Sequence, residues 1–100
     1  MSDAINCCVL TACIAELESL RYTPAGIPAL NLKLEHASSI VVAGQEQQVN
    51  AALKAKAFGT LAERLAVQAV GSVWRFTGHL ESPRSGKQVY LHIQDIAADH

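Results

Sequence analysis

The chain has 100 residues, of which 50% are hydrophobic and 17% are charged, and its formal net charge is −1. This length and composition are typical of a globular chain with one core, so we predict a single domain over residues 1–100 and exclude intrinsic disorder. The near-neutral charge excludes a uniformly basic nucleic-acid-binding surface, so any anion-binding surface has to be local. No apolar run approaches the roughly 20 residues that a membrane span requires.

Three cysteines, Cys7, Cys8 and Cys13, lie at spacings that fit neither a disulfide framework nor a zinc site. They belong to the stretch Cys7–Leu17, in which both alternating sets of residues are largely apolar. Such a strand is buried on both faces, either at the centre of a sheet or beneath a partner subunit. Unpaired cysteines favour a reducing compartment, so we expect a cytoplasmic protein.

A turn and a clear strand follow. Thr23-Pro24-Ala25-Gly26 predicts a turn, because proline presets φ and glycine accepts the left-handed position that closes it. In Leu30–His36, leucines alternate with polar residues, which predicts a strand with one face in the core and one in water. The next segment, Ala37–Gln47, is predicted to be a loop, although Ile40-Val41-Val42 is unusually apolar for one.

The stretch from Val49 to Val70 has the composition of a long helix, but Gly59 divides it. Before this glycine the apolar residues alternate with period two, which predicts a strand. After it they recur at helical spacing. Thr60 and Glu63 have the spacing of a capping box, so we predict that a helix begins at Thr60, and Gly71 suits its C-terminal cap.

Two further strands are predicted at Ser72–Glu81 and Val89–Ile96. The order strand, strand, strand, helix, strand, strand is that of a five-stranded oligonucleotide-binding (OB) barrel, so we predict an all-β OB-fold with one short helix. Such barrels bind ligands on the face of the second and third strands and on two flanking loops. Here these loops are Arg21–Pro28 and Ser82–Gly86.

Motifs of enzymes are missing from the sequence: there is no HExxH, no phosphate-binding glycine loop and no GxSxG. We therefore expect a protein that is not an enzyme and needs no cofactor. His79 and His92 are placed to face each other across the last two strands. A metal ion between them is only weakly supported, because no carboxylate or cysteine has a ligand spacing to them, so we assign no metal-binding residue.

The outward positions of the ligand face, its loops and the last two strands carry seven of the eight Lys and Arg residues. Cations along a groove follow the phosphates, and aromatic side chains let bases stack in a sequence-tolerant way. Taken singly, each cation is more simply a solvating residue, so the prediction rests on their shared location. The predicted DNA-binding residues are Arg21, Tyr22, Lys33, Asn50, Lys54, Lys56, Arg75, Arg84 and Lys87.

The stretch RYTPAGIPALNLKLEH, Arg21–His36, resembles the hairpin of bacterial single-stranded DNA-binding proteins. Its GIP and LEH portions are closer to one branch of that group, primosomal replication protein N (PriB). The similarity is strongest over Val9–Ser38 and continues less specifically toward VYLHIQDI. It implies a homodimeric, non-catalytic OB-fold protein that binds single-stranded DNA. It also implies that the protein works with the PriA helicase and other primosome proteins at replication forks.

Residue by residue, the resemblance implies DNA-contacting cations at Arg21, Arg84 and Lys87. It also implies a dimer contact through the first strand, at Cys7, Val9, Leu10, Thr11 and Cys13.

Two features of some family members are absent, because Asn50 stands where they have a stacking tryptophan and Ala37 where they have a cation. These differences favour weaker DNA binding. Two hypotheses follow: a single-stranded DNA-binding accessory of replication restart, or an OB-fold module that bridges proteins with weak or no DNA binding.

Overall fold

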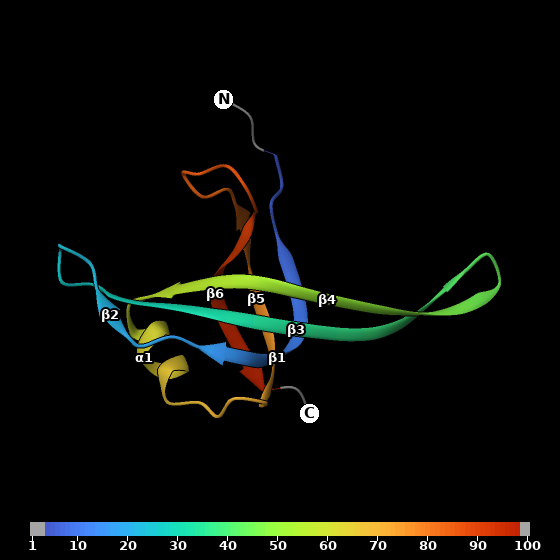
Figure 1. Cartoon of the computed structure of the whole chain (residues 1–100), viewed down its shortest axis with the longest axis horizontal. Coiled ribbons are helices and arrows are strands. Elements are labelled where there is room, and N and C mark those ends of the chain that lie inside the picture. Colours follow the sequence, from blue (N-terminus) through green and yellow to red (C-terminus); the bar gives the residue numbers. More distant parts are fainter. Residues whose placement is uncertain (1–3, 99–100) are drawn as a thin grey trace.

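The computed structural model describes residues 4–98. Their strands form one sheet in the order β1-β5-β6-β4-β3-β2, and an additional pairing of β1 with β3 closes it into a barrel (Figure 1). The predicted OB-fold with one short helix is thereby confirmed. The elements are β1 (Cys8–Leu17), β2 (Arg21–Tyr22), β3 (Pro28–Val42), β4 (Gln45–Phe58), α1 (Thr60–Ala66), β5 (Val73–Glu81) and β6 (Tyr90–Ala98).

β1 closes the barrel because it pairs with two neighbours in succession. Cys8–Cys13 pairs antiparallel with β5, and Cys13–Leu17 pairs antiparallel with β3 across an irregularity in register. Ala12 and Ile14 point into the barrel and are buried, whereas Val9 is 59% exposed. The prediction that both faces of this strand are buried is therefore wrong for the chain alone, since its outer face is open.

The barrel interior is filled by aliphatic side chains around Phe76. Leu30 and Leu34 of β3 alternate inward as predicted, and Leu91 of β6 meets them from the other side of the barrel. Helix α1 packs against β3 and β4 through Leu65. Burying one such leucine contributes about 1.5–3 kcal/mol to folding. No helix of the described residues is long and apolar enough to cross a membrane.

The predicted loop at residues 37–47 is instead the outer half of a long hairpin that projects from the barrel (Figure 1). β3 and β4 stay in register from Ala29 opposite Phe58 to Val42 opposite Gln45. Ile40, Val41 and Val42 are β-branched and favour a strand even where no core covers them. The two residues of the turn, Ala43 and Gly44, both have positive φ, as mirror-image hairpin turns require.

The helix begins at Thr60 as predicted, but the capping box does not form. The N-cap is Gly59, no side chain caps the helix, and the Glu63 N–H donates to the Gly59 carbonyl at 3.3 Å. The helix ends at Ala66, so the prediction that Gly71 caps it is also wrong. Instead the Gly71 N–H donates to the Ile14 carbonyl at 2.7 Å, which ties the segment after the helix to β1.

The predicted turn before β3 is confirmed. The Gly26 N–H donates to the Thr23 carbonyl at 2.8 Å, and Gly26 has a φ of 82°. The Thr23 hydroxyl also accepts a hydrogen bond from the Ile27 N–H at 3.2 Å. This turn holds the short strand β2 against the start of β3, which places Arg21 opposite Ala29.

Candidate nucleic-acid interface

Three lysines lie side by side on the outer face of β3 and β4. Lys33 is directly opposite Lys54, and Lys56 is opposite Asn31. On its other side, Lys33 is the register partner of Glu16 in β1. Like charges placed directly opposite each other destabilise a sheet. The Lys33–Lys54 pair is therefore unfavourable for the sheet, and Glu16 on the other side of Lys33 offsets part of this repulsion.

These lysines line a groove of about 750 Å³ between the β3–β4 face and the 82–89 loop. The loop contributes a fourth cation, Lys87, and β6 contributes Tyr90. A neighbouring hollow of about 440 Å³ shares Lys33 and Lys54 and continues the groove along the hairpin. In residues 4–98, no carboxylate oxygen lies within 4.0 Å of any of these four ammonium groups. Within the described residues, none of these four cations is therefore held in an ion pair.

Tyr90 is the aromatic residue of this groove. The Lys56 ammonium lies 4.5 Å from the centroid of its ring, which is a cation–π contact. Its hydroxyl donates to Glu81 Oε2 at 2.7 Å, and this bond to a carboxylate raises the pKa of Tyr90. The ring is therefore held at its hydroxyl by Glu81 and contacted on one face by Lys56.

The first predicted ligand loop reaches the rim of the groove through Arg21. Its guanidinium donates to Asn31 Oδ1 at 3.4 Å, and Asn31 lines the groove. Tyr22, the next residue of a strand, points to the opposite side. Its side chain is 61% exposed and does not line the groove.

Three other predicted DNA-binding residues lie outside the groove. Arg84 is exposed on the same loop as Lys87 but is not among the lining residues. Asn50 lies farther out on the hairpin, opposite Ala37. Arg75 is opposite Thr11 of β1, one of the predicted dimer residues.

The predicted dimer residues divide between the two faces of β1. Leu10 packs against the core. On the alternate face, Cys7 and Val9 are exposed, and Thr11 and Cys13 are half-buried. The outer face of β1 thus presents small and apolar side chains that the chain itself does not cover.

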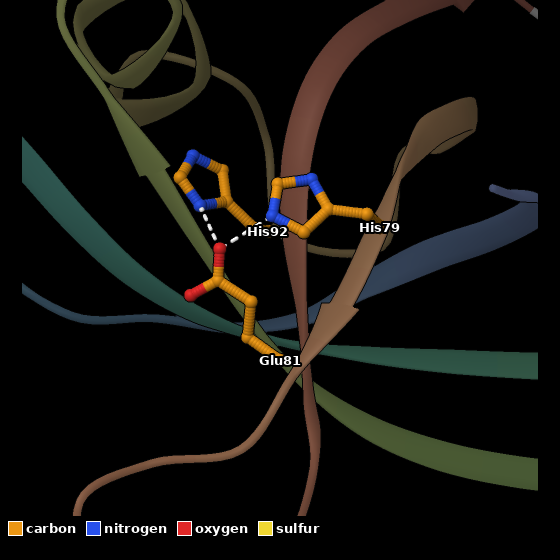
Figure 2. Close-up of side chains that lie close together, drawn as sticks. All are labelled: His79, Glu81 and His92. Carbon is orange, nitrogen blue, oxygen red and sulfur yellow. Dashed lines mark hydrogen bonds and ion pairs between the residues drawn. The ribbon is translucent and has the colours of Figure 1, made fainter. Parts of the chain in front are cut away.

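A second cluster lies beside the groove, on the outer face of β5 and β6 (Figure 2). His79 Nε2 and His92 Nδ1 both lie within hydrogen-bond reach of one oxygen, Glu81 Oε1, the latter at 3.0 Å. Hydrogen bonds from Tyr90 and His79 lower the pKa of Glu81 from its usual 4.5 to about 2. The two histidines face each other as predicted, with ring centroids 4.7 Å apart.

Sequence reasoning missed two members of these sites, Tyr90 and Glu81. Tyr90 alternates with the inward-facing Leu91, a signal visible in the sequence, but only the position of the loop shows that it borders the lysines. The conclusion that no carboxylate has a ligand spacing to the histidines is wrong. Glu81 is two residues from His79 on one face of β5, and the strand register brings His92 opposite His79.

Comparison with known proteins identifies the family. The family described as "Another single-strand binding protein family" matches residues 6–95. Replication restart protein PriB of Bordetella pertussis is 38% identical over 91 residues, which cover 90% of this chain and 85% of that protein. The PriB of Nitrosomonas europaea is 32% identical over 90% of this chain and 84% of its own. The chain belongs to the PriB branch of the single-strand binding protein family.

Solved structures agree with this assignment. The structure of PriB from Ralstonia solanacearum superimposes with a TM-score of 0.85 at 34% identity, covering 97% of this chain and 100% of that one. A single-stranded DNA binding protein from Thermus aquaticus superimposes with a TM-score of 0.78 at 22% identity, covering 96% of this chain and 50% of that one. This second likeness is one of fold.

Proposed function

We propose that this chain binds single-stranded DNA in the lysine groove as a non-catalytic accessory of replication restart. The observation that carries the proposal is the convergence of Lys33, Lys54, Lys56 and Lys87 around one groove. Membership of the PriB family and the name of its relatives support the biological setting. When these lysines neutralise the phosphates of a bound strand, the cations condensed on that strand are released into the solvent.

The proposed mechanism is tracking of the backbone with limited stacking. The lysines contact phosphates whatever the base, so binding is tolerant of sequence. Tyr90 offers an aromatic edge beside them, but its hydroxyl is tied to Glu81 and its ring contacts Lys56. We therefore assign most of the affinity to charge, with a strong dependence on salt.

We further propose that two chains associate through the outer face of β1. Val9 is 59% exposed there, and Cys7 and Thr11 lie on the same face. A symmetric dimer places this apolar strip against itself and removes it from water. In this arrangement the dimer carries two lysine grooves, and the PriA helicase is the partner that it bridges to DNA.

A second candidate function is protein bridging with little DNA binding. Glu16 and Glu18 line the same groove as the lysines and weaken its attraction for phosphate. In addition, residues 37–50 of the long hairpin contain no Lys or Arg. This surface is a poor path for DNA beyond the groove, and its exposed Ile40, Val41 and Val42 suit a protein contact instead.

The experiment that separates the two functions is a titration of a labelled single-stranded oligonucleotide, followed by fluorescence anisotropy at low and moderate salt. Binding that weakens with salt, and that duplex DNA of the same length displaces poorly, supports the first function. The same protein is then tested for capture of PriA. Capture of PriA without detectable oligonucleotide binding at low salt would establish the second function and reject the first.

A further inference from the structure

The cluster of His79, Glu81 and His92 lies beside the groove and is not needed for binding DNA there. Its potential ligand atoms, one from each residue, all lie within 4.8 Å of one another. We propose that these three residues form a binding site for a divalent transition-metal ion, with Zn²⁺ the ion that their donors fit best. This site goes beyond the proposed function and does not depend on it.

The geometry of the two strands brings the donors together. His79 and Glu81 are two residues apart on β5, so their side chains leave the same face of the sheet. His92 on β6 is the register partner of His79, and Tyr90 is the register partner of Glu81. Side chains at such directly opposite positions start about 4.5–5.5 Å apart at Cβ. Four adjacent positions on one sheet face thus form a compact square.

The donor atoms are already directed at a common point. His79 Nε2 and His92 Nδ1 both approach Glu81 Oε1, and Figure 2 shows the two rings turned toward that oxygen. An ion near this point needs the carboxylate to withdraw by roughly the 2.0–2.2 Å of a zinc–oxygen bond. Glu81 is at the end of β5 and its side chain is 38% exposed, so this small movement is open to it.

The donor set selects the class of metal. Two imidazoles and one carboxylate are a known ligand set for zinc sites that keep a fourth position for water. Magnesium and calcium prefer all-oxygen ligands, so they fit poorly here. The two histidine side chains are 26% and 30% exposed, which leaves a path for the ion and a place for its water.

Tyr90 supplies the outer support that such sites need. Its hydroxyl donates to Glu81 Oε2, the carboxylate oxygen that the histidines do not approach, at 2.7 Å. This bond orients the carboxylate, so that Oε1 is the oxygen directed at the histidines. Removal of an outer partner of this kind typically weakens metal binding 10–100-fold. Phe58 packs against the His92 ring, with centroids 5.2 Å apart, and limits its rotation.

The test is a calorimetric titration of the untagged protein with Zn²⁺ and, separately, Co²⁺ at neutral pH. Cys7, Cys8 and Cys13 are all free thiols, so the parent protein for this titration is the Cys7→Ser/Cys8→Ser/Cys13→Ser variant, in which no thiolate competes for the ion. We expect one ion per chain. Co²⁺ should give the visible absorption of a tetrahedral site, whereas Mg²⁺ should not compete.

Variants locate the ion. His79→Gln and His92→Gln should each weaken binding at least 10-fold, and Tyr90→Phe by about 10-fold. The matched control is His36→Gln, because the ring nitrogens of His36 are bonded elsewhere, to the Thr11 carbonyl and the Ser38 hydroxyl. This control should bind the ion as the parent does. Equal affinity of the parent and the His79→Gln/His92→Gln double variant would overturn the proposal, as would no binding at millimolar Zn²⁺.

A second measurement does not depend on variants folding. Long-range ¹H–¹⁵N correlation spectra of the parent should show shifts at His79 Nε2 and His92 Nδ1 on addition of Zn²⁺, with His36 unchanged. Shifts confined to other histidines would reject the site.

Discussion

At the scale of single residues, the groove brings like charges together on one sheet face. Lys33 and Lys54 are directly opposite each other, and in residues 4–98 neither has a carboxylate within 4.0 Å. Their repulsion opposes folding, and a bound phosphate relieves it. Their outward direction was predictable from strand alternation. The outward direction of Tyr90 was predictable in the same way, but only strand register and loop position show that Tyr90 and Glu81 border the site.

Lys54→Gln should move stability and function in opposite directions. Removing one of two opposed cations should leave the melting temperature unchanged or raise it slightly. The same change should weaken single-stranded DNA binding and reduce the salt slope by about 0.7, the value for one phosphate contact. Thermal unfolding and anisotropy measure the two effects. Arg64→Gln, on the exposed face of α1, is the control and should change neither. A Lys54→Gln variant that loses stability and keeps its affinity would contradict this account.

At the scale of elements, the long β3–β4 hairpin is the part of the fold that the sequence predicted least well. Its inner half has leucines at every second position and was predicted correctly. Its outer half has exposed faces on both sides, so no alternation of apolar and polar residues marks it as a strand. Only the ladder of backbone pairs between Ser38–Val42 and Gln45–Val49 defines it.

The hairpin offers a gain-of-function prediction. Ala37 and Asn50 are cross-strand partners, so the cation and the tryptophan that some family members are expected to carry would lie side by side here. Ala37→Lys/Asn50→Trp should tighten single-stranded DNA binding, since stacking of one base contributes about 1–3 kcal/mol and the lysine adds one phosphate contact. Anisotropy measures the gain. The control is Ser39→Lys/Gln48→Trp, at another exposed cross-strand pair of the same hairpin. This pair lies farther from the groove, so its gain in DNA affinity should be smaller. Equal gains from the two pairs would show that DNA does not follow the inner hairpin.

At Gly78 of β5, the backbone of β6 leaves no room for a side chain. A Cβ added there would lie 2.1 Å from the His92 carbonyl oxygen, beside the irregularity in register between Thr77 and Gly78. Gly78→Ala should destabilise the fold by about 1–3 kcal/mol or more, as overpacking against backbone does. That corresponds to a fall in melting temperature of roughly 10 °C for a domain of this size.

The control for this substitution is Gly44→Ala at the hairpin tip. Gly44 has a φ of 79°, but an added Cβ meets nothing within 4 Å. The free energy of unfolding that Gly44→Ala loses should therefore come only from the strain of an alanine in the left-handed conformation, about 1 kcal/mol. Equal losses of stability in Gly78→Ala and Gly44→Ala would show that contact with the β6 backbone does not cause the destabilisation at Gly78.

At the scale of the whole molecule, the order of elements was enough to predict the barrel. The sequence shows the alternation of apolar and polar residues in β3 and β4, and it shows that Gly59 separates β4 from α1. It also shows the two final strands. What covers the outer face of β1 was not predictable. A strand that is apolar on both faces has the same sequence pattern whether its own chain or another chain covers it. The structure leaves that face open, with Val9 59% exposed.

Val9→Asp should therefore separate the proposed dimer without unfolding the barrel. An aspartate on this strip places two like charges against each other across a symmetric interface. Sedimentation velocity should show a dimer for the parent and a monomer for the variant, with unchanged circular dichroism. Val67→Asp, at a residue 81% exposed beside the helix end, is the control and should stay dimeric. A parent that is monomeric at tens of micromolar would reject the dimer.

The central claim is that the four lysines of the groove hold the DNA backbone. The measurement that tests it most directly is the salt dependence of oligonucleotide affinity for the parent and for Lys33→Gln/Lys54→Gln/Lys56→Gln/Lys87→Gln. Arg64→Gln, which removes a cation outside the groove, is the control. We predict that the lysine variant loses about 3 units of salt slope, while the control loses less than 1. An unchanged slope in the lysine variant, or an equal loss in the control, would contradict the account.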